Sequence, residues 1–489
     1  MTRKLFGTDG VRGVAGELLT AELAVGLAQA ATRLARSERR VQRPQVLIIR
    51  DTRESGEMLQ AAVAAGVAAA GGDALLGGVL PTPAAPLLIA DYGFDLAAVL
   101  SASHNPFQDN GIKFFGPDGY KLSDKTELAI ERELESGFAA PAGLAPARGE
   151  GEGEGGGGNE GEGGVNEGEA GNEGVVGNED EDEAGGAPPA IGRIRELRGA
   201  GEDYLRALHS RFAELDLSGL DVVLDCANGA TYEVAPEIFR RLGARVTVLA
   251  DAPDGRNINA GCGSTHIDAL AAHVREGGHA LGFAFDGDGD RVLAVDRDGA
   301  VVDGDELMAL IALHLRERGV LPGDGVAVTV MTNYGFHTAM ADAGIEVAST
   351  QVGDRYVLAE LLARGWTLGG EQSGHLIELS FNRTGDGIAG ALLTLEALCG
   401  RDLRERDAMV KLPQRLVNVR VRDRGALEGS AEVGAAVRAQ DEALAGRGRV
   451  LVRASGTEPL VRVMVEAPTE AEADDVCTRL VDIVRGELA

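Results

Sequence analysis

The sequence predicts an α/β protein built from several domains, because one strand–helix–strand pattern recurs along it. The pattern is an apolar strand, a polar or glycine-containing loop, a helix, a glycine and a second strand, and it starts at Val46, at Asp221 and at Gly325. Strands that alternate with helices are typical of largely parallel sheets covered by helices. A chain of 489 residues is also too long for one ordinary hydrophobic core. We therefore expect three related α/β domains.

The chain changes character at about residue 408. Segments 412–423 and 448–467 alternate apolar and polar residues, as strands with one buried face do. Segment 469–488 has the apolar spacing of a helix that packs on such strands. This region therefore predicts a fourth domain, of the α+β type.

A low-complexity segment, 149–190, interrupts this organisation. It contains 13 acidic residues and no basic ones, among glycines and asparagines with almost nothing to bury. Such a composition predicts a disordered insertion in a surface loop, with an interaction tail as the alternative. The expected division of the chain is 1–145, 191–298, 299–407 and 408–489 for the four domains and 146–190 for the disordered Gly/Glu-rich insertion.

The composition disfavours several classes of protein. A net charge of −30 argues against nucleic acid as a partner. The sequence has no apolar stretch of the roughly 18 residues that a membrane-spanning helix needs, and no apolar signal core follows Arg3 and Lys4. The four cysteines are scattered without a C-x-x-C pair, as is typical of a reducing compartment. We therefore expect a cytoplasmic protein with no membrane or nucleic-acid partner.

The clearest candidate for a metal site is LGFAFDGDGDRVLAVD, residues 281–296. An apolar strand delivers Asp286, Asp288 and Asp290 with glycines between them, and three carboxylates this close repel one another unless a cation neutralises them. Oxygen-only ligands favour a hard metal ion, Mg²⁺ before Ca²⁺. The EF-hand pattern fails, because it requires glycine where Arg291 stands. An acidic turn without metal is the alternative.

Ser103 and His104 raise the question of how this serine is used. A hydrolytic serine needs a base that an acid from elsewhere in the chain orients, and adjacent Ser and His side chains are expected to point in different directions. The sequence has no G-x-S-x-G elbow. A phosphorylated Ser103 would give the three aspartates a purpose, since Mg²⁺ could bind them and a phosphoserine oxygen together. We therefore expect Ser103 to carry a phosphoryl group; a turn with capping duties only is the alternative.

Further polar groups lie in glycine-containing loops. Lys113 is one of only five lysines in an arginine-rich chain, which favours a role for its titratable ammonium group. Arg12 lies in a Gly-rich loop that can approach a phosphate closely. RASGTEPLVR combines guanidinium, hydroxyl and backbone N–H groups, which suit a dianionic phosphate. GGEQSGH carries carboxylate and hydroxyl groups that suit sugar hydroxyls, and a plain polar loop is the alternative for both stretches.

Six stretches together resemble the motifs of one enzyme family, the α-D-phosphohexomutases. They occur in the family's order and span the whole chain except the insertion. The EQSGH wording is similar to that of the phosphoglucosamine mutases, more than to that of the phosphomannomutases or phosphoglucomutases. The stretches are FGTDGVRG (6–13), SASHNPFQDNGIKFF (101–115), DGDGDR (286–291), VGDRYV (352–357), GGEQSGH (369–375) and RASGTEPLVRVM (453–464).

The resemblance implies four domains around a central cleft and a role for each matching residue. Ser103 matches the phosphoserine, which is also a metal ligand, and His104 would position its loop. The three aspartates match the ligands of one Mg²⁺ per chain. Groups that stabilise charge or move protons would be Arg12, Lys113 and His375. Substrate would be bound by Arg291, by Glu371 and Ser373 in the sugar loop, and by Arg453, Ser455, Gly456, Thr457 and Arg462 in the phosphate loop.

The implied activity is that of an isomerase. It would interconvert glucosamine 6-phosphate and glucosamine 1-phosphate through a glucosamine 1,6-bisphosphate intermediate, on the route to UDP-N-acetylglucosamine and peptidoglycan precursors. A sugar 1,6-bisphosphate would serve as activator, and the chain would work on sugar phosphates as a monomer or homodimer. The alternatives are a phosphomannomutase or phosphoglucomutase with the same mechanism, a Mg²⁺-dependent phosphatase, and a non-enzymatic scaffold.

Overall fold

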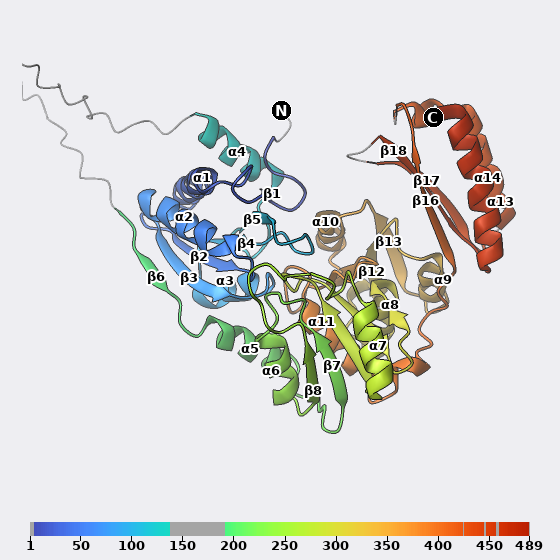
Figure 1. The fold of residues 1–489 in the computed structure, drawn as a ribbon, viewed down its shortest axis with the longest axis horizontal. Coiled ribbons are helices and arrows are strands. Elements are labelled where there is room, and N and C mark those ends of the chain that lie inside the picture. The colour runs from blue at the N-terminus through green and yellow to red at the C-terminus, as the bar shows by residue number, and fades with distance from the viewer. Residues whose placement is uncertain (1–3, 137–190, 424, 445, 456–458, 489) are drawn as a thin grey trace, which may run out of the picture.

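The computed structural model describes residues 4–136, 191–423, 425–444, 446–455 and 459–488. Four sheets follow one another along these residues, each with its own helices (Figure 1). The first three sheets contain parallel strand pairs, and the fourth is wholly antiparallel. The predicted fold class is therefore confirmed. The Gly/Glu-rich insertion lies outside the described residues, and its disorder stays a prediction.

The first sheet has the order β1-β5-β4-β2-β3-β6. Its central strands β2 and β4 are apolar and almost wholly buried, as parallel strands covered on both faces are. Helix α1 begins after Thr20, whose hydroxyl accepts the N–H of Leu23 as a side-chain N-cap. The elements are β1 (Val11–Val14), α1 (Ala21–Arg39), β2 (Gln45–Arg50), α2 (Ser55–Ala69), β3 (Asp73–Val79), α3 (Ala84–Tyr92), β4 (Leu96–Leu100), β5 (Asp109–Phe115) and α4 (Asp124–Glu135).

The sixth strand of this sheet comes from beyond the insertion. β6 (Ile194–Glu196) runs parallel to β3, with Leu75 opposite Arg195. The chain thus completes the first sheet before it enters the second domain. The boundary expected at residue 191 stays a prediction.

The second sheet, of order β11-β10-β9-β7-β8, ends in a hairpin that carries the acidic motif. β9 and β10 are antiparallel, and Phe285 pairs with Val292, so residues 286–291 form the connecting turn. The elements are α5 (Ala200–Arg211), β7 (Asp221–Asp225), α6 (Val234–Arg241), β8 (Arg245–Leu249), α7 (Asp268–Gly277), β9 (Leu281–Phe285), β10 (Val292–Asp296) and β11 (Val301–Val302).

The third sheet has the order β13-β12-β14-β15. Its first helix, α8, begins with a capping box in which Asp303 and Glu306 satisfy each other's backbone N–H groups. The elements are α8 (Gly304–Glu317), η1 (Pro322–Asp324), β12 (Gly325–Thr329), α9 (Tyr334–Asp342), β13 (Glu346–Thr350), α10 (Asp354–Arg364), β14 (Leu368–Gly370), β15 (Leu376–Glu378), α11 (Gly387–Leu398) and η2 (Leu403–Glu405).

The fourth sheet, β16-β18-β17, lies with α13 and α14 at one end of the molecule (Figure 1). Its buried apolar residues form a core of their own, whereas one cluster of buried residues runs through the first three domains. A core of its own is typical of a separate domain. The elements are β16 (Gln414–Arg420), α12 (Ala426–Gly429), α13 (Ala431–Leu444), β17 (Arg449–Ala454), β18 (Leu460–Glu466) and α14 (Glu470–Leu488).

Two sequence expectations about the environment can be compared with the structure. In the described part of the chain, no helix combines the length and the apolar character that crossing a membrane requires. All four cysteines lie in that part and carry free thiols.

Candidate active site

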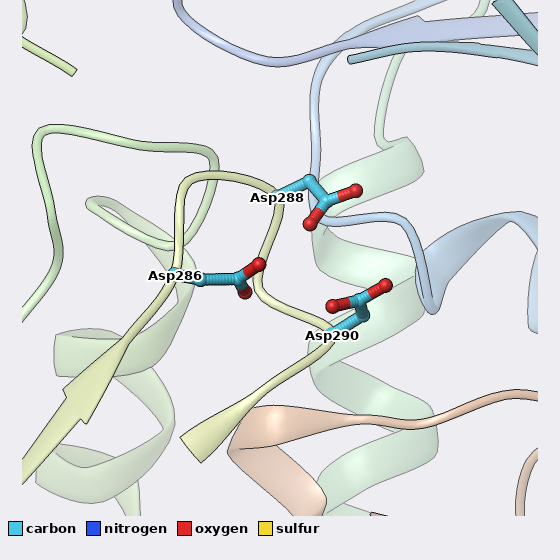
Figure 2. A group of neighbouring side chains, drawn as sticks. All are labelled: Asp286, Asp288 and Asp290. Carbon is cyan, nitrogen blue, oxygen red and sulfur yellow. The ribbon is translucent and has the colours of Figure 1, made fainter. Parts of the chain in front are cut away.

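The three aspartates of the β9–β10 turn converge on one point. Figure 2 shows their carboxylates turned toward a common space from a single loop. All three are buried, and one oxygen of each lies within 4.8 Å of the others. One oxygen of Asp288 and one of Asp290 are buried without a hydrogen-bond partner. Unpaired buried carboxylate oxygens are costly, so this set fits a hard divalent cation such as Mg²⁺.

The electrostatics of this set favour the binding of a cation. Burial, together with the charges of Asp290 and Asp288, raises the pKa of Asp286 well above its usual range. Burial also opposes ionisation of Asp290, but His375, Lys113 and Arg291 hold its pKa below the usual value. A carboxylate that ionises with difficulty beside two others gains most from a bound cation.

Glycines in the turn let a second loop approach it closely. A Cβ at Gly287 would lie 2.5 Å from the carbonyl oxygen of Ser103 and 2.8 Å from Nδ2 of Asn259. Gly289 has a φ of +70°, and a Cβ there would lie 2.5 Å from Cγ2 of Thr231. A side chain at Gly287 would push the serine loop away from the carboxylates, and one at Gly289 would collide with Thr231.

Ser103 lies directly against the metal ligands. It is 1% exposed, adopts a left-handed φ of 53°, and its hydroxyl donates to Oδ2 of Asp286 at 2.5 Å. His104 is close as well: its Nδ1 lies 3.4 Å from Oγ of Ser103. The expectation that these adjacent side chains point in different directions is therefore wrong, because the left-handed turn brings them to the same side. Burial and the cations Arg291 and Arg12 lower the pKa of His104.

Lys113 lies between two acidic groups from different domains. Its Nζ donates to Oδ2 of Asp288 at 2.7 Å and lies 3.0 Å from Oδ2 of Asp9. Burial opposes its charge, yet Asp288 and Asp9 raise its pKa above the usual value. Asp9 also pairs with Arg12 and Lys121, and these cations, against the effect of burial, hold its pKa well below the usual range. A fixed cationic centre therefore flanks the carboxylates.

His375 connects this centre with the third domain. Its Nδ1 lies 3.6 Å from Asp290 and its Nε2 lies 3.8 Å from Asp354, which accepts from Lys121 at 2.5 Å. Burial lowers the pKa of His375, but the two acids more than compensate and raise it. The N–H of Gly385 lies 3.2 Å from Nε2, so the neutral ring carries its proton on Nδ1, toward Asp290.

The residues that are expected to contact the sugar differ in how far they are buried. The N–H of Arg291 donates to Asp286 at 3.2 Å, and its Nε lies 3.9 Å from Asp290. Burial opposes the charge of Arg291, but the surrounding acids, Glu371 among them, raise its pKa. Glu371 is buried and accepts the N–H of Gly353 at 3.0 Å, whereas Ser373 is exposed.

The expected phosphate loop lies in the fourth domain. Arg453 and Arg462 face each other across β17 and β18, and burial together with the charge of Arg462 lowers the pKa of Arg453. No carboxylate of the described residues pairs with either arginine, and none of their contacts reaches the Ser103 cluster. Ser455 is buried beside them. Gly456 and Thr457 lie outside the described residues.

Sequence reasoning missed several charged residues of this centre. Asp9 lies inside FGTDGVRG, where Arg12 alone is a predicted site residue, and Asp354 lies inside VGDRYV, a stretch with no predicted site residue. Lys121 is also one of the only five lysines of the chain, so the scarcity of lysine that indicates Lys113 could have indicated it too. Arg53 lies in no motif, and only the fold reveals its contacts with the serine loop.

Models of one protein family match all four domains. They are described as phosphoglucomutase/phosphomannomutase alpha/beta/alpha domains I, II and III and the C-terminal domain, and match residues 3–140, 202–299, 303–416 and 416–483. A curated phosphoglucosamine mutase of Moorella thermoacetica is 48% identical over 490 residues, which cover 99% of each chain. That of Leifsonia xyli is 45% identical, again over 99% of each chain.

Solved structures share the fold. A phosphoglucomutase/phosphomannomutase family protein of Burkholderia thailandensis has a TM-score of 0.74 at 21% identity, with 99% of this chain and 97% of that chain covered. Aspergillus fumigatus N-acetylphosphoglucosamine mutase, solved with GlcNAc-6P and magnesium, has a TM-score of 0.64 at 18% identity, with 100% and 96% covered. On the full-length matches in sequence, the chain belongs to the phosphoglucomutase/phosphomannomutase family of α-D-phosphohexomutases and, within it, to the phosphoglucosamine mutases.

Proposed function

We propose that the chain interconverts glucosamine 6-phosphate and glucosamine 1-phosphate, with Ser103 as its phosphoryl carrier. The observation that carries this proposal is the hydrogen bond from Ser103 to Asp286, inside a buried set of three carboxylates. Phospho-Ser103 gives its phosphoryl group to the free hydroxyl of the substrate: the bond from phosphorus to Oγ breaks as a bond to the sugar oxygen forms. The glucosamine 1,6-bisphosphate then reorients in the site, and its other phosphoryl group is transferred to Ser103.

The residues around Ser103 supply charge and proton transfer in this proposal. Asp286, Asp288, Asp290 and a phosphoserine oxygen hold one Mg²⁺, which when bound withdraws charge from phosphorus. Lys113 and Arg12 stabilise the charge of the transferring phosphoryl group. His375, the titratable group between two acids, takes the proton of the sugar hydroxyl and returns it in the reverse step. His104 positions the serine loop.

Substrate binding is assigned to groups farther from the serine. Arg291, Glu371 and Ser373 contact the sugar. The paired arginines of the fourth domain lack an anionic partner among the described residues, which suits a site for the phosphate that does not react. That clamp consists of Arg453, Ser455, Gly456, Thr457 and Arg462. Movement of the fourth domain would close the cleft and exclude water, which would otherwise hydrolyse the phosphoserine.

The proposal includes the setting of the enzyme. We place it in the cytoplasm, as a monomer or homodimer that acts on sugar phosphates and is activated by a sugar 1,6-bisphosphate. The four free thiols support a reducing compartment such as the cytoplasm.

A substrate comparison tests the proposed function. Purified protein receives the 6-phosphates of glucosamine, mannose and glucose in turn, with Mg²⁺ and a trace of glucose 1,6-bisphosphate, and the 1-phosphates and free phosphate are measured. We expect glucosamine 6-phosphate to have the highest kcat/KM. Faster turnover of mannose or glucose phosphate would keep the mechanism and contradict the assigned substrate. Free phosphate as the main product would indicate a phosphatase.

Asp354→Asn tests the contact between the first and third domains. The amide keeps the shape of the side chain but removes the charge that pairs with Lys121 and supports the protonated form of His375. We expect kcat to fall about tenfold. Glu360→Gln on the same helix, where the glutamate pairs with Arg364 at the surface, is the control. An unchanged kcat in Asp354→Asn would remove this contact from the mechanism.

A further inference from the structure

Arg53 is a fully buried arginine in the loop between β2 and α2, outside the residues assigned above. Its side chain has no exposed surface, and Asp51 neutralises its charge: Nε donates to Oδ2 of Asp51 at 2.8 Å. A buried arginine is costly unless all of its donors are used. The partners of its remaining donors therefore show what the residue does.

Both terminal nitrogens of Arg53 donate to backbone carbonyls of the serine loop. Nη2 donates to the carbonyl oxygens of Ser103 at 2.9 Å and Asn105 at 2.8 Å. Nη1 donates to those of Pro106 and Asp109, the latter at 2.8 Å. One guanidinium thus binds four backbone carbonyls of the serine loop. The planar fork of arginine suits this task, and the single ammonium of a lysine cannot reproduce it.

Asp51 extends the same network to the reactive serine. The hydroxyl of Ser101 donates to Asp51 at 2.6 Å, and it accepts the N–H of Ser103 at 2.9 Å. Both backbone polar groups of Ser103 are therefore held, the N–H through Ser101 and the carbonyl by Arg53. These bonds keep Ser103 in its left-handed conformation, which is unfavourable for a side-chain-bearing residue unless its surroundings impose it.

A second donor reaches the same carbonyls from the second domain. Nδ2 of Asn259 donates to the carbonyl oxygens of Ser103 at 2.9 Å and Asn105 at 3.1 Å. Gly287 of the acidic turn packs against the same carbonyl of Ser103. The serine loop is therefore held between Arg53 on one side and the domain that carries the metal ligands on the other.

We infer that Arg53 is a positioning residue for phosphoryl transfer: it holds the carbonyls of the Ser103 loop so that Oγ faces Asp286, with Asn259 as its counterpart from the second domain. The inference rests on the proposed function of Ser103 as phosphoryl carrier. Arg53 itself touches no reacting atom, and it acts through the backbone of the serine it holds.

Arg53→Lys is the test, with two readouts. One is the kcat and KM for glucosamine 6-phosphate, and the other is the rate at which glucose 1,6-bisphosphate phosphorylates Ser103, followed by intact mass. We expect both kcat and the phosphorylation rate to fall about 100-fold, because a small misplacement of a reacting atom has an effect of this size. KM should stay within about threefold of the wild-type value, since the substrate contacts are unchanged.

The control is Arg256→Lys. Arg256 is an exposed arginine that pairs with Glu54, the residue after Arg53, and this variant should behave as wild type. A folded Arg53→Lys, judged by its melting temperature, whose kcat is near wild type or whose loss lies only in KM would overturn the inference. If Arg53→Lys does not fold, the same measurements on Asn259→Gly test the inference. Glycine tolerates the φ of +58° at this position, so the change removes the amide donor without backbone strain.

Asn259→Gly is expected to lower kcat and the phosphorylation rate about tenfold, and values near wild type would overturn the inference. Failure of the proposed function would be seen differently. A wild type that takes up phosphate on Ser103 without converting glucosamine 6-phosphate would contradict the assigned substrate, and the phosphorylation rates of the variants would still measure the effect of Arg53. A wild type whose Ser103 takes up no phosphate would overturn both the proposed function and this inference.

Discussion

Ser103→Ala is expected to lower turnover of glucosamine 6-phosphate at least about 10⁴-fold, as loss of a covalent carrier does in other enzymes. The substitution removes the only atom that carries the phosphoryl group in the proposed mechanism, and alanine can adopt the same backbone conformation. The measurement is a coupled assay of glucosamine 1-phosphate formation with Mg²⁺ and glucose 1,6-bisphosphate. The intact mass of the variant should show no phosphate after incubation with the bisphosphate.

Ser37→Ala is the matched control. Ser37 is an exposed serine of the same domain whose hydroxyl donates to the carbonyl of Leu34 in its own helix, and its loss should change neither activity nor phosphorylation. Residual turnover of Ser103→Ala within about 100-fold of wild type would mean that another group accepts the phosphoryl group. Equal melting temperatures of the two variants would show that the loss comes from chemistry and not from unfolding.

Removal of the metal should lower activity about as strongly as Ser103→Ala does. It should also lower the thermal stability of the wild type. Chelation with EDTA should abolish turnover, and added Mg²⁺ should restore it. Free Mg²⁺ at about 100 times its Kd should stabilise the wild type by about 2.7 kcal/mol, which a thermal melt detects as a rise in melting temperature.

Asp286→Asn separates the stabilising effect of bound Mg²⁺ from the destabilising effect of the ionised carboxylate in the metal-free protein. Burial and the neighbouring Asp290 and Asp288 raise the pKa of Asp286, so its ionised form is costly in the folded state at neutral pH. The amide should therefore make the metal-free protein more stable than metal-free wild type, while activity and the Mg²⁺-dependent rise in melting temperature are lost. Asp298→Asn, an exposed residue just beyond the same hairpin, is the control. A metal-free Asp286→Asn that melts lower than metal-free wild type would contradict the repulsion on which the metal assignment rests.

Much of the candidate active site was predictable because its functional residues lie in short sequence motifs. The acidic motif follows an apolar strand directly, and the β9–β10 hairpin places the three aspartates in one short turn. The strand–helix–strand pattern likewise predicted the fold class, since hydrophobic periodicity is local. The structure confirms that class. The roles of the site residues, including Lys113, Arg12 and His375, stay predictions.

The charged groups that hold these residues were not predictable in the same way. Lys121 pairs with Asp9, 112 residues away, and with Asp354, 233 residues away, and no local pattern announces either contact. Ser103 and His104 show the same limit at the shortest range. Their side chains lie on one side because the loop adopts a left-handed turn, and that turn is held by Arg53 and Asn259.

The sequence by itself determined the fold class and the acidic turn, because each depends on residues close together in the chain, and its motifs indicated Ser103 as the reactive serine. Only the tertiary structure decided how that serine is held and which cations and acids surround it. Such contacts join segments far apart in the chain, some of them from different domains, and the pairing of a buried charge depends on which segments the packing of the cores brings together. A buried arginine such as Arg53 is intelligible only after its partners are known, since its burial is tolerable only when every donor is satisfied.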